Sequence, residues 1–387
     1  MTMVSFDNTE TAFQAKNGSD LNRSYWLFKL IGNPTLVKMG ASLAPLALNL
    51  GMGGIIKRTI FRQFVGGENI NDCANAINEL GKYGIGGILD YSVEGKESEA
   101  DFDHCRDETI ATFEMARKNK NIPFCVFKVT GLARFGLLEK VTKGTVLSAE
   151  ESQEWERVRA RVAAICDTAK ANHQPVFIDA EESWIQQAID DLANENIWRC
   201  NKDSAIVYNT FQLYRHDRYA YLKWSIEEAR KRGVHLGAKL VRGAYMEKER
   251  ERAVQMGYAS PIQPDKAATD RDYDKAVELC VENIEMTAFC AGTHNEKSSA
   301  LLARLMNEKN IPHADKRIYF SQLYGMSDHI SYNLAADGYK VSKYVPYGPV
   351  KEVLPYLIRR AMENTSVKGQ TGRELGLIIK EKKRRAH

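Results

Sequence analysis

Short apolar runs alternate with helix-like segments from residue 86 onward, and this alternation constrains the fold more than any other feature of the chain. The runs are rich in β-branched and aromatic residues and lie at 86–91, 124–132, 175–181, 205–214, 235–245, 286–295, 318–326 and 339–347. Runs of this length are typical of strands buried on both faces, as in a parallel sheet. Charges on one side and aliphatic residues on the other mark amphipathic helices at 103–119, 151–172, 184–194, 218–232, 273–285, 296–310 and 350–364.

Eight strands alternating with helices predict an α/β chain whose sheet closes into a (β/α)8 barrel. A doubly wound open sheet is the alternative, but it usually has fewer strands and a glycine-rich phosphate loop after the first one. No such loop follows residue 91. Residues 1–85 lack the alternation and predict an N-terminal helical arm, with helices at 24–30, 43–50 and 71–83, before a barrel domain over 86–387. A loop over 258–271 is expected to interrupt the fifth crossover.

Composition and charge exclude several functional classes. The chain has 387 residues, 44% hydrophobic and 27% charged, which is average for a globular protein. Its net charge of +4 gives no reason to expect nucleic acid as a partner. The seven cysteines are scattered without a CxxC pair, so free thiols are expected and no metal centre.

Two segments bear on contact with a membrane. The stretch 39–56 is uncharged and about as long as a short membrane span, but its glycines and Pro45 favour a buried or membrane-touching helical segment. The basic end at 379–387 is typical of a solvated tail and is also suited to touch an anionic surface.

Polar residues end most of the apolar runs, where barrels of this kind place their active sites. They are Lys128, Asp179, Glu181, Gln212, Arg242, Tyr245, Thr293, His294, Asn295, Tyr324 and Tyr344. Each alone is more often a structural hydrogen-bonding group, but together they indicate an enzyme with a large polar ligand. Lys128 alone would also fit a Schiff-base aldolase.

The predicted helix 350–364 gathers polar groups on one face. Tyr356, Arg359, Arg360 and Glu363 stand at i, i+3, i+4 and i+7. The face could simply be solvated, or its two guanidinium groups could form a fork for a carboxylate.

These segments carry a family resemblance. The motifs KLVRGAYMEKER (239–250), GTHNEKS (292–298), GMSDHIS (325–331) and KYVPYGPVKEVLPYLIRRAMEN (343–364) resemble successive signatures of the proline dehydrogenase family. FKVTGL around Lys128, IDAEES around Asp179 and GYASPIQPDKAAT (257–269) match it too. The sequences of these motifs are more similar to those of the single-function enzymes than to those of the fused bacterial enzymes.

The resemblance implies an FAD-dependent enzyme on a distorted (β/α)8, TIM-like barrel. Such an enzyme oxidises L-proline to Δ1-pyrroline-5-carboxylate by hydride transfer to flavin N5, the first step of proline catabolism, and passes electrons to a membrane quinone. By matching motifs, Lys128, Arg359 and Arg360 hold the proline carboxylate. Asp179 pairs with Arg359, Tyr344 and Tyr356 pack against the substrate ring, and Leu323 covers its other edge.

The same motifs imply a set of FAD contacts: Gln212, Lys239, Arg242, Gly243, Ala244, Thr293, His294, Asn295 and Glu363. One departure is Lys239, where the fused bacterial enzymes have arginine. The N-terminus lacks the order of a signal or transit peptide. We therefore expect a cytoplasmic enzyme, peripheral at the inner membrane or mitochondrial if a presequence has been removed.

Three alternatives remain beside proline oxidation. Hydroxyproline dehydrogenases tend to have serine where this chain has Tyr344, so the bulky ring favours proline. A lysine-dependent aldolase acting through Lys128 and a non-catalytic amino-acid sensor are the alternatives from other classes.

Overall fold

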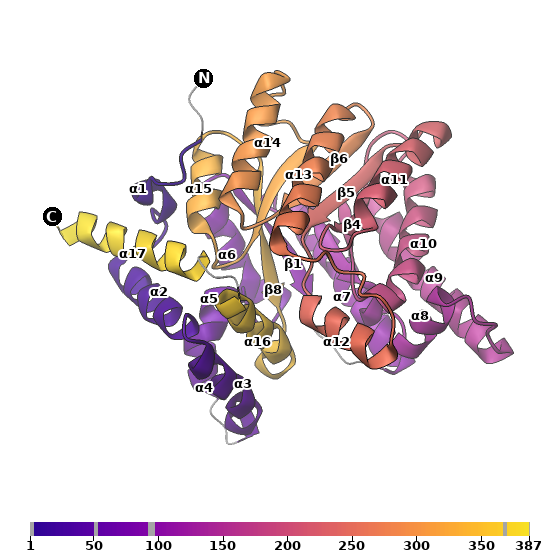
Figure 1. Ribbon diagram of the computed structural model, residues 1–387, viewed down its shortest axis with the longest axis horizontal. Helices are drawn as coiled ribbons and strands as arrows, with labels where there is room; N and C mark the ends of the chain where they lie inside the picture. Colours follow the sequence, from indigo (N-terminus) through magenta and orange to yellow (C-terminus); the bar gives the residue numbers. More distant parts are fainter. Residues whose placement is uncertain (1–3, 50–52, 92–96, 367–369, 387) are drawn as a thin grey trace. The chain divides into compact units, whose positions relative to one another are not determined.

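The computed structural model (Figure 1) describes residues 4–49, 53–91, 97–366 and 370–386. Its strands form a closed barrel in the order β1 to β8. The predicted (β/α)8 barrel is confirmed. Each of the eight apolar runs contains one strand: β1 (Ile85–Tyr91), β2 (Cys125–Lys128), β3 (Val176–Asp179), β4 (Val207–Gln212), β5 (Leu236–Val241), β6 (Thr287–Gly292), β7 (Ile318–Leu323) and β8 (Val341–Tyr347).

Helices precede β1 and follow each strand. Those before β1 are α1 (Thr9–Ala12), α2 (Gly18–Ile31), α3 (Pro34–Asn49), α4 (Gly53–Ile56), the π-helical segment Lys57–Phe61, α5 (Arg62–Phe64) and α6 (Ile70–Gly81). Those between strands are α7 (Glu99–Lys118), α8 (Phe135–Thr142), α9 (Ala149–Ala171), α10 (Ser183–Cys200), α11 (Arg218–Arg232), α12 (Met246–Met256), α13 (Lys266–Glu282), α14 (Glu296–Glu308) and α15 (Asp328–Ala336). The chain ends with α16 (Val350–Ser366) and α17 (Gln370–Ala386).

Residues 95–321 form one compact unit, which holds β2 to β6 and most of β7. Its strands pair in parallel in sequence order. Aromatic rings pack together near the amino ends of these strands: Phe124 stacks on Phe177 with 4.3 Å between ring centroids and meets Tyr319 edge-on at 4.8 Å. Gly237 makes room for a neighbouring ring, because a Cβ there would lie 2.6 Å from Tyr208 Cγ.

The chain up to residue 94 and from 322 onward forms a second compact unit. In it β1 pairs with β8 in parallel, with Ile88 opposite Tyr344. Helices α2, α3, α16 and α17 bury apolar side chains in one cluster, which includes Phe28, Val37, Leu357 and Ile378. The predicted boundary between an arm over 1–85 and a barrel over 86–387 stays a prediction.

The helical predictions were incomplete in places. All seven predicted segments between the strands and after β8 are helical, but α8, α12, α15 and α17 were missed. The basic end that was predicted to be a tail is helical as far as Ala386. In α12 the buried residues are Glu249 and Ala253, so no apolar stripe marks the helix in the sequence. The expected loop 258–271 ends early, because the Asp265 side chain accepts from the Ala268 amide at 2.7 Å and starts α13 at Lys266.

The stretch 39–56 does not form one continuous described helix. Helix α3 ends at Asn49, α4 starts at Gly53, and residues 50–52 lie outside the described part of the chain. Within the described ranges, none of the helices combines the length and the hydropathy needed to cross a bilayer. All seven cysteines are buried free thiols.

Candidate active site

Three charged side chains meet toward the carboxyl ends of β2, β3 and β5. Lys128 and Asp179 end their strands and lie opposite each other in the register. The Lys128 ammonium lies 3.3 Å from Asp179 Oδ2, and the Lys239 ammonium donates to Asp179 Oδ1 at 2.5 Å. The structure thus places all three at the end of the strands where this fold builds its active sites.

In this cluster the Asp179 carboxylate contacts both ammonium groups. Asp179 and Lys239 are buried, and Lys128 is mostly so. Removing one partner of a buried pair leaves an uncompensated charge, so Asp179 is what allows the two lysines to lie there. The Lys239 ammonium also lies 5.5 Å above the Phe177 ring, a cation–π contact. Ammonium groups of this kind are suitable donors for an anionic group on a ligand.

Glu181 supports the turn that follows Lys128. Its carboxylate accepts a hydrogen bond from the Thr130 amide at 3.0 Å and another from the Thr130 hydroxyl. Thr130 lies in the 3-10 turn Val129–Gly131, directly after β2. Burial raises the pKa of Glu181 to about 7, although the Thr130 hydroxyl acts in the opposite direction. The conformation after β2 therefore depends on a carboxyl group that titrates near neutral pH.

Arg242, just after β5, is held on several sides. Its guanidinium donates to Asp270 Oδ1 at 2.7 Å, to Thr293 Oγ1 at 2.6 Å and to Ser298 Oγ at 3.0 Å. It also lies 4.3 Å above the Tyr273 ring. Burial alone would raise the pKa of Asp270, but hydrogen bonds from Lys266 and Arg242 hold that pKa below its usual range. The result is a fixed cation beside the ends of β5 and β6.

Gly243 follows Arg242 and cannot be replaced without strain. Its φ is +132°, and a Cβ would lie 2.4 Å from the Tyr214 ring. Gly243 and Ala244 are exposed, so their backbone is accessible to a ligand. Beyond β6, Asn295 caps α14 by accepting from the Lys297 and Ser298 amides.

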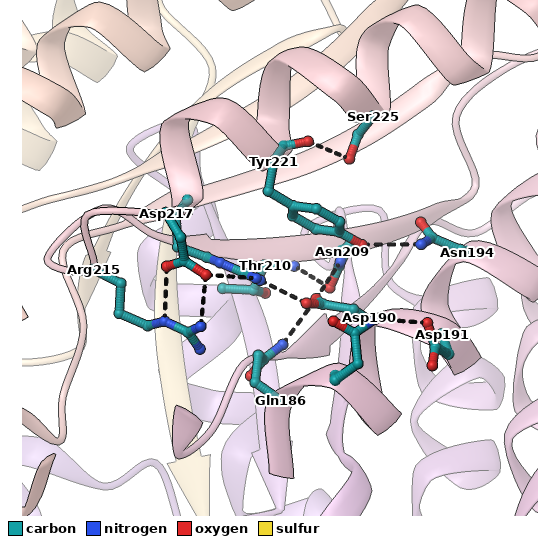
Figure 2. Close-up of polar contacts among 12 residues, drawn as sticks. Gln186, Asp190, Asp191, Asn194, Asn209, Thr210, Arg215, Asp217, Tyr221 and Ser225 are labelled. Carbon is teal, nitrogen blue, oxygen red and sulfur yellow. Dashed lines mark hydrogen bonds and ion pairs between the residues drawn. The ribbon is translucent and has the colours of Figure 1, made fainter. Parts of the chain in front are cut away.

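Gln212 ends β4 and is buried, and in the described part of the chain its Oε1 has no hydrogen-bond partner. Behind β4 lies a buried polar network centred on Asp190 of α10 (Figure 2). Asp190 accepts from Gln186 Nε2 at 3.0 Å, Asn209 Nδ2 at 2.9 Å and Arg218 Nη1 at 2.6 Å. The network therefore ties α10, β4 and α11 together and supports the strand that presents Gln212.

The second unit holds the other predicted substrate residues. Tyr344 is buried in β8, and on α16 the Arg360 guanidinium lies 5.3 Å above the Tyr356 ring. Tyr356 belongs to the apolar core of this unit, and Leu323 packs against the same core. Arg359 is partly exposed on the same helix. Glu363 lies in α16, but its side chain is outside the described part of the structure.

A sequence profile of the family described as "Proline dehydrogenase" matches residues 73–373, more than half of the chain. The chain belongs to the proline dehydrogenase family. It is therefore an enzyme of that family, as its motifs predict.

Three individual proteins are similar to this chain over most of its length. "Proline dehydrogenase 1, mitochondrial" from Dictyostelium discoideum is 32% identical over 88% of this chain and 67% of its own length. "Hydroxyproline dehydrogenase" from Xenopus laevis is 30% identical over 96% of this chain and 88% of its own. "Carbapenem antibiotics biosynthesis protein CarD" from Pectobacterium carotovorum subsp. carotovorum is 33% identical over 83% of each chain.

The fold agrees with solved structures. Proline utilization A (PutA) from Bdellovibrio bacteriovorus superposes with a TM-score of 0.72 over 94% of this chain, at 21% identity. The alignment covers 37% of the PutA chain, so this protein spans about a third of that structure. At this identity the likeness shows the barrel fold alone.

The proline dehydrogenase motifs imply FAD, and the residues present fit a ligand of that kind. Gln212 offers a buried acceptor that a ligand N–H could satisfy, as buried polar groups require. Gly243 lets the backbone approach closely, and Arg242 supplies a fixed cation beside it. The individual FAD contacts and the pairing of Asp179 with Arg359 stay predictions.

Several residues at this end of the barrel were not identified from the sequence. Asp270, Tyr273 and Ser298 all contact Arg242, yet none of them ends an apolar run. Asp270 and Tyr273 lie in the first turns of α13, in a stretch partly expected to be a loop. One signal was present in the sequence: Ser298 follows the helix-capping residue Asn295 by three positions, and its amide donates to the Asn295 side chain.

Proposed function

We propose that this proline dehydrogenase family member oxidises L-proline to Δ1-pyrroline-5-carboxylate, with FAD as its cofactor, in the first step of proline catabolism. The observation that carries the proposal is the cluster of Lys128, Asp179 and Lys239, whose two buried or mostly buried ammonium groups are donors of the kind that a carboxylate accepts from. The proposal agrees with the family match over residues 73–373.

The substrate carboxylate is assigned to Lys128, Arg359 and Arg360. Each charge-assisted hydrogen bond to it contributes about 1.5–3 kcal/mol. Tyr344 and Tyr356 pack against the pyrrolidine ring, and Leu323 covers its other edge. Anchoring the carboxylate fixes the orientation of the ring, which is the main task of the protein when a cofactor carries the redox chemistry.

FAD, when bound, supplies a hydride acceptor at its flavin N5. The two electrons leave the ring carbon that is next to the nitrogen and far from the carboxylate, while the amine proton passes to water. Arg242, Gly243, Ala244, Thr293, His294 and Asn295, with Gln212, Lys239 and Glu363, are assigned to hold the cofactor. A membrane quinone is the proposed final electron acceptor, which requires peripheral contact with a membrane.

Two alternatives are weaker. The hydroxyproline dehydrogenase of Xenopus laevis is among the relatives, but by the resemblance such enzymes tend to have serine where this chain has the bulky Tyr344, which favours proline. A Schiff-base aldolase needs a neutral lysine amine. Asp179, 3.3 Å from Lys128, stabilises the charged ammonium instead.

The proposal is tested by replacing Arg359 while keeping the fold. We expect Arg359→Met to raise KM for L-proline at least ten-fold in a dye-reduction assay, because one charge-assisted bond of about 1.5–3 kcal/mol is lost. The visible spectrum should still show bound FAD. Lys351→Met, an exposed change at the start of the same helix, is the matched control and should leave KM unchanged.

An Arg359→Met enzyme with an unaltered KM would contradict the assignment of this residue to the substrate carboxylate. If the wild-type enzyme reduced no dye with L-proline, the proposed reaction itself would be wrong.

A further inference from the structure

Helices α2 and α3 follow one another in the chain and contact each other, and both expose large apolar side chains. Trp26, Leu30, Leu36, Met39 and Leu43 have between 40% and 54% of their surface exposed. We call these five residues the α2–α3 apolar face. Exposed apolar residues scattered singly are ordinary, whereas a cluster of them marks an interaction site.

The opposite side of each helix is buried, so the apolar face is additional to the side that packs in the core. Phe28, Ile31 and Val37 lie in the core with residues of α16 and α17. Trp26 and Leu30 are one turn apart on α2. Leu36, Met39 and Leu43 follow an i, i+3, i+7 pattern on α3, so each set forms a stripe along its helix. Helices that are apolar on both sides are typical of protein cores and of lipid contact.

The same part of the chain carries only positive charge. Residues 21–67 contain no aspartate or glutamate and six cations: Arg23, Lys29, Lys38, Lys57, Arg58 and Arg62. Arg23 and Arg62 lie near Asp20, and Lys57 pairs with Glu68. Within the ranges that the structure describes, Lys29, Lys38 and Arg58 pair with no carboxylate, so their charge is available to a partner.

The basic C-terminal helix adds to this charge. Helix α17 packs against α2, as Figure 1 shows, and the Lys382 ammonium lies 4.5 Å above the Tyr25 ring. Its last turn carries Lys383, Arg384 and Arg385. Arg384 and Arg385 pair with Glu381, so α17 adds a moderate excess of positive charge beside α2.

We propose that the α2–α3 apolar face docks on an anionic lipid bilayer. Its aromatic and aliphatic side chains enter the boundary between headgroups and acyl chains, while Lys29, Lys38 and Arg58 contact lipid phosphates. A second copy of the chain would bring two predominantly cationic surfaces together, which is unfavourable. An anionic bilayer complements both the apolar and the charged component. The inference rests on the proposed function, in which a membrane quinone accepts the electrons.

The test uses the full-length FAD-loaded protein and large vesicles. Co-sedimentation gives the partition coefficient for vesicles of phosphatidylcholine alone and of phosphatidylcholine with phosphatidylglycerol. We expect binding at least ten-fold tighter to the anionic vesicles and weakening as salt is added. Lys29→Gln/Lys38→Gln/Arg58→Gln should lose at least ten-fold, because each cation near an anionic surface contributes about 1 kcal/mol, or about five-fold.

The apolar component is tested by Leu36→Gln/Met39→Gln/Leu43→Gln, which should also lose at least ten-fold. The matched control removes three exposed apolar residues elsewhere, Val146→Gln/Val254→Gln/Met256→Gln, and should bind like the wild type. All substituted positions are exposed, and unchanged thermal unfolding would show that the variants remain folded.

Three results would overturn the inference: no vesicle binding, equal binding to neutral and anionic vesicles, or wild-type binding by the Leu36/Met39/Leu43 variant. Self-association that this variant abolishes would assign the face to a second copy instead. Reduction of a soluble dye by L-proline is measured on the same samples. Dye reduction without vesicle binding refutes only the docking surface, whereas vesicle binding without dye reduction refutes the proposed reaction.

Discussion

Tyr344 is the residue whose size bears most directly on substrate choice. Its ring is buried in β8, and the resemblance assigns it to the substrate ring. We expect Tyr344→Ser to shift the ratio of kcat/KM values for L-proline and trans-4-hydroxyproline at least about ten-fold toward hydroxyproline. Steady-state assays with both substrates measure this ratio.

The control for this prediction is Tyr344→Phe, which keeps the ring and should keep the preference for proline. The serine variant should also lower the free energy of unfolding by about 3 kcal/mol, because it replaces a buried ring by a small side chain. A wild-type enzyme that uses both substrates equally well would show that Tyr344 does not select proline.

The charged cluster at the strand ends shows what can be read from single residues in the sequence. Lys128 and Asp179 stand out because they end apolar runs, and Lys239 because it lies in a family motif. That Asp179 faces both lysines could not be predicted, since Lys239 is 60 residues away. The contact depends on the register of β3, β4 and β5, which local patterns do not determine.

At the scale of elements, Asp190 joins α10, β4 and α11. Its side chain is fully buried, and it compensates the buried Arg218 guanidinium. We expect Asp190→Asn to lower the free energy of unfolding by about 3–5 kcal/mol, because Arg218 would be left without its buried partner charge. Urea unfolding measures the loss.

The neighbouring Asp191 provides a matched control on the same helix (Figure 2). It is exposed and accepts from Gln187 at 2.8 Å. Asp191→Asn should change the free energy of unfolding by less than about 0.5 kcal/mol. Equal effects of the two substitutions would mean that the buried network does not stabilise β4.

Glu374 attaches α17 to the turn before α15. Its Oε1 accepts from the Ser327 amide at 2.8 Å, and Ser327 has the left-handed φ of +51°. Burial raises the pKa of Glu374 to about 7, and Asp328 adds to the rise, while His329 and Lys343 act in the opposite direction. The folded chain therefore keeps this proton at a pH where the unfolded chain has lost it.

This shift predicts a pH dependence of stability. When folding raises the pKa of a carboxyl group, that group contributes to stability below its pKa in the unfolded chain, about 4.5. This contribution to the free energy of unfolding is lost as the pH rises to about 7. Glu374→Gln cannot ionise, so the difference in free energy of unfolding between variant and wild type should grow by about 3 kcal/mol over this range. Urea unfolding across the range measures it, with the exposed Glu308→Gln as the control. A constant difference would mean that Glu374 ionises normally.

Short length explains why two helices, α8 and α15, were missed in the sequence. Helices were predicted where an apolar stripe alternated with charges, and α8 and α15 are too short to display one clearly, at eight and nine residues. Helix α15 also begins after Ser327 without a side-chain cap, so the usual start signal is absent. An apolar stripe appears in a sequence because one side of the helix is buried. A helix with few buried turns has too few apolar positions for the stripe to be recognised.

At the scale of the whole molecule, the closed barrel could be predicted because each strand carries its own apolar run. Eight such runs admit few other architectures. Which strands belong to which compact unit could not be predicted in the same way. Strands β1 and β8 come from opposite ends of the barrel sequence, yet they pair within one unit. Which distant strands share a unit is a property of the assembled sheet.

The central claim, oxidation of L-proline by a flavoprotein, is tested most directly by the visible absorption spectrum under anaerobic conditions. We would record it for the purified protein before and after adding L-proline. We expect a flavin band that L-proline bleaches and that trans-4-hydroxyproline bleaches much less. A flavin band that L-proline leaves unchanged, or no flavin even after reconstitution with FAD, would contradict the claim.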